Sequence, residues 1–138
     1  MAIPMSDAPP AGGVARTHRV LALLFLAGGV LQFFLAGLGA FGASSFDTHA
    51  AVGTLLTIVA LVVLILAAVG RREALQASAV LFALMIVQNI LGAAGDDVGV
   101  LGGLHPVTGL LILGVAMLTA AGAPVRLGGH GRARPPVA

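Results

Sequence analysis

The chain has 138 residues, of which 59% are hydrophobic and 9% are charged. A soluble domain would carry roughly 25% charged residues, so this composition predicts an integral membrane protein with the lipid bilayer as its main solvent. Cysteine is absent, which excludes disulfides, thiolate metal sites and covalently attached c-type haem, and the basic residues form no face suited to nucleic acid.

Four stretches without Asp, Glu, Lys or Arg follow a Pro-, Gly- and Ala-rich segment, residues 1–19, that we expect to be a disordered tail. These stretches are residues 20–46, 50–70, 74–95 and 104–125. Each is about 20 residues or longer, enough for one helix to cross a bilayer. The sequence therefore predicts an all-α membrane protein, with an up-down bundle of four transmembrane helices over residues 20–123. Residues 124–138 are predicted to form a flexible basic tail.

The charged residues are divided between the two ends of this bundle. Arginine occurs in both tails and in the connection between helices two and three, at positions 16, 19, 71, 72, 126, 132 and 134. Asp47, Asp96 and Asp97 fall in the two opposite loops, which contain no arginine. Because arginine marks cytoplasmic loops, we expect an inner-membrane protein with both termini in the cytoplasm. His49 and His105 then lie near the outer face, and His18 lies at the headgroup level of the cytoplasmic face.

An internal repeat relates the two halves of the chain. A shift of 56 residues aligns residues 31–56 with 87–112 without a gap. The scarcer matches are Gln32 with Gln88, His49 with His105, and Gly53 with Gly109. Two hairpins inserted in the same orientation are related by an axis along the membrane normal. The second and fourth helices then lie diagonally across the bundle, with the two histidines at equal depth on opposite walls of one cavity.

This arrangement predicts a bound haem. A haem iron accepts one neutral imidazole on each face of the porphyrin, so His49 and His105 are candidate axial ligands of a b-type haem. Gly53 and Gly109 lie one turn deeper on the same helix faces, where a missing side chain would let the macrocycle approach the backbone. We expect His105 in the opening turn of helix four, where Pro106 is tolerated because first-turn N–H groups lack intrahelical partners.

Simpler readings of the same residues remain open. A histidine at a helix mouth can be an interfacial residue, and a glycine near it can serve close helix packing. Gln32 and Gln88 either hydrogen-bond between helices or contact the edge of a bound ligand. Zinc or copper is an alternative to haem, with nearby aspartates as further ligands, although two histidines leave a tetrahedral site two ligands short.

The segment "VQNILGAAGDDVGVLGGLHPVTGLL" and the paired histidines resemble one half of the haem A synthase family. The resemblance covers roughly residues 20–122 and extends to small uncharacterised four-helix bacterial membrane proteins. It implies a four-helix bundle with a histidine pair on its second and fourth helices. The family places a glutamate three residues before a ligand histidine and often an arginine after it. Here Phe46 and Gly102 take the first position, while Ala50 and Pro106 take the second.

The missing glutamate and the missing second half favour cofactor binding over enzymatic oxidation of a haem methyl group. The leading hypothesis is a cytochrome-like protein for electron transfer, redox sensing or haem handling, with a quinone or a membrane redox protein as partner. The alternative is a scaffold or subunit without cofactor, whose Gly- and Ala-rich faces bind other helices or a second copy of the chain. A small dimeric exporter is a third hypothesis, weakened because no acidic residue lies deep in a span.

Overall fold

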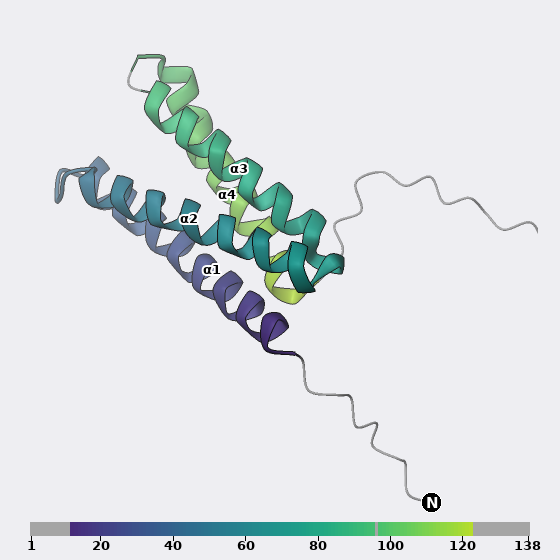
Figure 1. Ribbon diagram of the computed structural model, residues 1–138. Helices are drawn as coiled ribbons and strands as arrows, with labels where there is room; N and C mark the ends of the chain where they lie inside the picture. Colours follow the sequence, from purple (N-terminus) through teal and green to yellow (C-terminus); the bar gives the residue numbers. More distant parts are fainter. Residues whose placement is uncertain (1–11, 96, 123–138) are drawn as a thin grey trace, which may run out of the picture.

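The computed structural model describes residues 12–95 and 97–122, and this part of the chain is helical with short connections (Figure 1). The helices are α1 (Gly13–Ala40), α2 (Asp47–Gly70), the short 3-10 helix η1 (Arg72–Ala74), α3 (Leu75–Ala94) and α4 (Gly99–Ala121). The four α-helices are each long and apolar enough to cross a membrane. The predicted all-α bundle of four transmembrane helices is confirmed.

The helices pack in a ring around the bundle axis. α1 packs against α2 and α4, and α3 packs against the same two helices, so α2 and α4 lie diagonally across the bundle. The α1–α2 and α3–α4 hairpins converge at the end where α1 begins and α4 ends, and they diverge toward their own loops (Figure 1). The start of α1, η1 and the end of α4 therefore share one end of the molecule.

The internal repeat governs which residues are buried. In α1 the buried residues are His18, Ala22, Phe25 and Gly29, and their counterparts 56 positions later are the buried residues Ala74, Ser78, Leu81 and Met85. In α2 the buried residues Leu56, Ala60 and Val63 correspond to the buried Ile112, Ala116 and Thr119 of α4. Equivalent helix faces thus point toward the same axis, as expected for two parallel copies of one hairpin.

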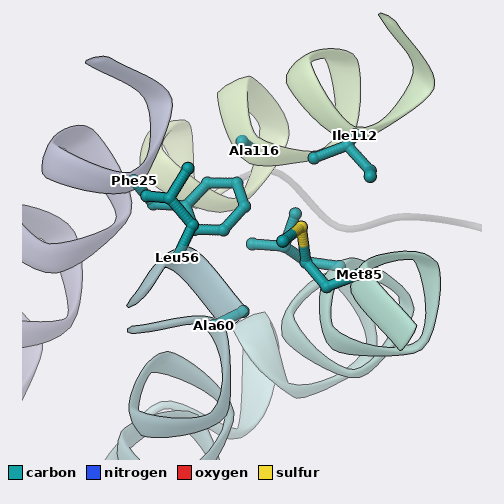
Figure 2. Packing of buried hydrophobic residues seen from close by; sticks show 7 residues of the cluster. Phe25, Leu56, Ala60, Met85, Ile112 and Ala116 are labelled. Carbon is teal, nitrogen blue, oxygen red and sulfur yellow. The ribbon is translucent and has the colours of Figure 1, made fainter. Parts of the chain in front are cut away.

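An apolar layer fills the middle of the bundle, where side chains from all four helices meet (Figure 2). Its members are Phe25, Leu56, Ala60, Leu81, Met85, Ile112 and Ala116. Ala60 and Ala116 occupy equivalent positions on the diagonal helices and leave room for the rings and longer chains. Because lipid is as apolar as leucine, this layer gains stability from close packing rather than from removal of side chains from water. The layer separates the two ends of the bundle.

Two helices begin earlier than the sequence predicted. α1 starts at Gly13, so residues 13–19 of the expected tail are helical, because His18 on that segment is buried inside the bundle. α4 starts at Gly99, which places His105 in its second turn and Pro106 inside the helix. The expected first-turn position of Pro106 is therefore wrong: its missing N–H removes a bond to the carbonyl of Gly102. Residues 1–11, Asp96 and the predicted tail at 124–138 lie outside the described residues.

Candidate functional site

A cavity of about 860 Å³ opens between the diverging hairpins, on the loop side of the apolar layer. All six predicted site residues line it: Gln32, His49, Gly53, Gln88, His105 and Gly109. The volume lies within the range of about 300–1,000 Å³ that is typical of small-molecule and cofactor sites. The structure thus brings together residues that lie up to 77 positions apart, from Gln32 to Gly109.

The two imidazoles face each other across the bundle diagonal. The ring centroids of His49 and His105 are 5.9 Å apart, and the ring planes are inclined by 62°. Phe46 and His49 form a T-shaped pair with ring centroids 6.2 Å apart, and Phe46 also lines the cavity. Two metal–imidazole bonds of about 2.0 Å each, plus the half-width of each ring, span a similar distance. The separation of the rings is therefore close to that of two imidazole ligands on one metal ion.

Each histidine is oriented by a backbone carbonyl of the preceding helix. His49 Nδ1 lies 3.2 Å from the carbonyl oxygen of Gln32, and His105 Nδ1 lies 3.1 Å from that of Gln88. Both partners are 17 residues upstream of their histidine, so the repeat reproduces the bond. A carbonyl oxygen only accepts hydrogen bonds, so Nδ1 must carry the proton in both rings. This tautomer leaves each Nε2 with a free lone pair, which is the state that a metal ligand requires.

The two glutamines belong to this arrangement through their side chains as well. Gln32 Nε2 donates to the carbonyl oxygen of His49 at 3.0 Å, so that backbone and side chain of one residue both hold His49. The carboxamide oxygens Oε1 of Gln32 and Gln88 are buried and find no hydrogen-bond partner within the described residues. Both glutamines line the cavity, so two buried acceptors without a partner lie next to it.

The two glycines make room for side chains of the neighbouring helices. A Cβ atom on Gly53 would lie 2.9 Å from Gln32 Nε2. A Cβ atom on Gly109 would lie 3.2 Å from Phe33 Cζ and 3.5 Å from Gln88 Nε2. The glycines line the cavity as predicted, and in this structure the space next to their Cα atoms is taken by these side chains. Direct contact between a macrocycle and the glycine backbones stays a prediction.

Sequence reasoning missed some residues that shape the site. Gly92 of α3 packs under His105, since a Cβ atom there would lie 3.1 Å from His105 Cε1. Asn89 donates from Nδ2 to Thr57 Oγ1 at 3.0 Å, which joins α3 to α2 beside the cavity. The repeat aligns Gly92 with Ala36, and the small size of both residues was the signal in the sequence that could have pointed to Gly92. The hydrogen bond between Asn89 and Thr57 has no counterpart between the equivalent residues of the repeat. The repeat therefore could not predict it.

A tetrahedral zinc or copper centre finds little support among the described residues. Within 12–95 and 97–122, no group of three or more His, Asp or Glu side chains is placed to hold a metal ion. Asp47 instead accepts a hydrogen bond from Ser45 Oγ through Oδ2 at 2.8 Å. The site offers two imidazoles whose Nδ1 atoms are both engaged by backbone carbonyls.

His18 faces the inside of the bundle, whereas its depth at the headgroup level stays a prediction. It is fully buried at the opposite end of the bundle, with Nε2 3.1 Å from Ser78 Oγ on α3. Its counterpart in the repeat, Ala74, is also buried, so position 18 belongs to the inward face of the bundle. A polar cross-link between α1 and α3 satisfies the imidazole there, apart from the buried Nδ1 atom. As expected, His18 stands apart from the histidine pair.

Comparison with known proteins gives one similarity. The model of a family of unknown function, DUF6220, matches residues 32–94. The matched segment runs from Gln32 to the end of α3 and includes His49, Gly53 and Gln88, but stops before α4 with His105 and Gly109. No curated protein and no solved structure matches the chain.

Proposed function

We propose that the protein is a membrane cytochrome that binds one b-type haem between α2 and α4, with His49 and His105 as the axial ligands. The observation that carries this proposal is the pair of equivalent bonds from Nδ1 to the carbonyls of Gln32 and Gln88. These bonds fix both rings in the ligating tautomer, at a separation of 5.9 Å.

The haem would supply a one-electron iron couple. The residues of this chain would hold the cofactor and keep the surroundings of the iron apolar: Phe33 and Phe46 line the cavity near the loops, and the apolar layer closes its floor. With both His49 and His105 as ligands, the iron would have no open position, which would favour electron transfer over oxygen activation. Redox sensing and haem handling would use the same haem site and would differ from electron transfer in the partner that the protein meets.

The partner would be a quinone or another membrane redox protein that approaches from the outer side. The arginines at the opposite end of the bundle support this orientation, with both termini in the cytoplasm of an inner-membrane protein. The resemblance to one half of haem A synthase supports cofactor binding by a histidine pair. The family's glutamate has no equivalent beside His49 or His105, so enzymatic oxidation of the haem is not part of the proposal.

The test is a visible absorption spectrum of the full-length protein, purified in detergent from haem-replete cells. A Soret band in stoichiometric amount, and a pyridine haemochrome spectrum of b-type haem, are the expected results. A monodisperse protein from such cells that carries no haem, and takes up none when hemin is added, would refute the proposal. The haem-free scaffold would then be the better description.

A further inference from the structure

A second cavity, of about 440 Å³, lies at the end of the bundle where the hairpins converge, between α1 and α4. Three arginines line it: Arg16 and Arg19 from the start of α1, and Arg71 from the connection between α2 and α3. It is separated from the histidine pair by the apolar layer and contributes nothing to the proposed haem site.

The three arginines bring an excess of positive charge to this cavity. Arg16 and Arg19 are three residues apart and share one face of α1. Arg71 is half-buried, bonds Glu73 through Nε, and reaches the carbonyl oxygen of Ala15 on α1 through Nη1 at 3.5 Å. Three guanidinium charges against the one carboxylate of Glu73 leave a local charge of +2 among these residues. This excess attracts an anion.

The wall of the cavity is apolar below the arginines. Val20 and Leu23 of α1 are each 48% exposed, and they line the cavity together with Ala121 of α4. α4 ends at Gly122, whose φ of 69° suits glycine. A Cβ atom on Gly122 would lie 3.0 Å from Arg71 Nη2, so the missing side chain lets the guanidinium reach α4. The groove is therefore cationic at its mouth and hydrocarbon-like toward the bilayer core.

We propose that this groove binds an anionic phospholipid. The guanidinium groups of Arg16, Arg19 and Arg71 donate hydrogen bonds to the headgroup phosphate, for which their planar fork geometry is well suited. One acyl chain follows Val20 and Leu23 along the surface of α1. The continuous apolar wall favours a lipid over a free phosphate ion, and basic pockets between transmembrane helices recognise lipid headgroups in this way.

The experiment is native mass spectrometry of the full-length protein in delipidating detergent, titrated with palmitoyl-oleoyl phosphatidylglycerol, with the phosphatidylcholine of the same chains, or with inorganic phosphate. We expect one tightly bound phosphatidylglycerol and weaker binding of the other two. The variant Arg19→Gln should weaken phosphatidylglycerol binding at least tenfold, about the loss of one charge-assisted hydrogen bond. The matched control is Arg72→Gln, because Arg72 is exposed at the same end and does not line the groove.

A second variant tests the acyl groove without a change of charge. Ala121→Phe should fill the apolar wall and lower phosphatidylglycerol binding, whereas Met117→Phe, at an exposed position outside the groove, should not. Equal loss in Arg72→Gln and in Arg19→Gln, which remove one charge each, would show that net charge alone attracts the lipid and would overturn the site. Equal binding of phosphatidylcholine would do the same. Tight binding of inorganic phosphate, unaffected by Ala121→Phe, would replace the lipid with a free anion.

Discussion

His49 and His105 lie on diagonal helices, 56 residues apart in sequence, and their rings are 5.9 Å from each other. Each ring is held by the backbone carbonyl of a glutamine 17 residues upstream. The two histidines are thus related by the internal repeat in position and in the bond from Nδ1 to a backbone carbonyl. Residues that share these features should respond in the same direction to substitution, and this makes the proposed coordination testable.

The first prediction concerns the two axial positions. The purified protein should contain six-coordinate, low-spin iron in both redox states, because neither face of the haem is open. His49→Ala and His105→Ala should each produce a high-spin spectrum or loss of haem, to a similar extent. Electron paramagnetic resonance and absorption spectroscopy measure the spin state. His130→Ala, which changes a residue outside the described part of the chain, serves as the control.

An unaltered low-spin spectrum in either histidine variant would contradict bis-histidine ligation. A high-spin spectrum of the unsubstituted protein would leave haem binding in place but remove one of the two ligands. Such a high-spin spectrum would point to an open coordination position on the iron and hence to oxygen or substrate chemistry.

The second prediction concerns Gly92, which packs under His105. In Gly92→Ala the new Cβ atom would lie 3.1 Å from His105 Cε1 and 3.3 Å from Nδ1, so the ring must shift by a few tenths of an ångström. That shift weakens the bond to the Gln88 carbonyl, and changes of such second partners typically cost about 10–100-fold in metal affinity. We expect lower haem affinity by hemin titration and altered g values in electron paramagnetic resonance.

The control for Gly92→Ala is Gly103→Ala on α4, where an added Cβ meets no atom within 4 Å. Both variants exchange a helical glycine for alanine, so they share the gain in helix propensity. If both bind haem like the unsubstituted protein, the support of His105 by Gly92 is unimportant for ligation.

The sequence was sufficient to predict the helix number, the diagonal placement of α2 and α4, and the convergence of six residues on one cavity. The length of each uncharged stretch predicts one membrane-spanning helix, and the repeat indicates which helices are equivalent. Helix starts were less predictable, because the inward position of His18 extends α1 and such tertiary burial leaves little local signal. The role of Gly53 as space for Gln32 also depends on the angle between neighbouring helices, which composition does not encode.

The third prediction concerns orientation in the membrane. Cysteines introduced at Ser44 and Gly99, which are exposed in or beside the two loops on the histidine side, should react with an impermeant maleimide added to intact cells. Gly128→Cys, in the basic C-terminal segment, should react only after the membrane is permeabilised, because arginine-bearing segments stay in the cytoplasm. Labelling of Gly128→Cys in intact cells would place the histidine pair on the cytoplasmic side instead.

The last prediction separates the histidine that stabilises the bundle from the two that would bind haem. His18 and Gln32 lie fourteen residues apart, about 21 Å along α1, with the apolar layer between them. His18→Ala removes the bond to Ser78 and leaves a void in a fully buried position. Interhelical hydrogen bonds in membranes contribute about 0.6 kcal/mol on average, and the void adds a packing loss. We expect a lower midpoint of thermal unfolding in detergent, a smaller decrease for Ser78→Ala, which leaves less empty space, and an unchanged haem spectrum in both. A haem spectrum altered as strongly by His18→Ala as by His105→Ala would mean that the two ends of the bundle are coupled, and that the apolar layer does not insulate the site.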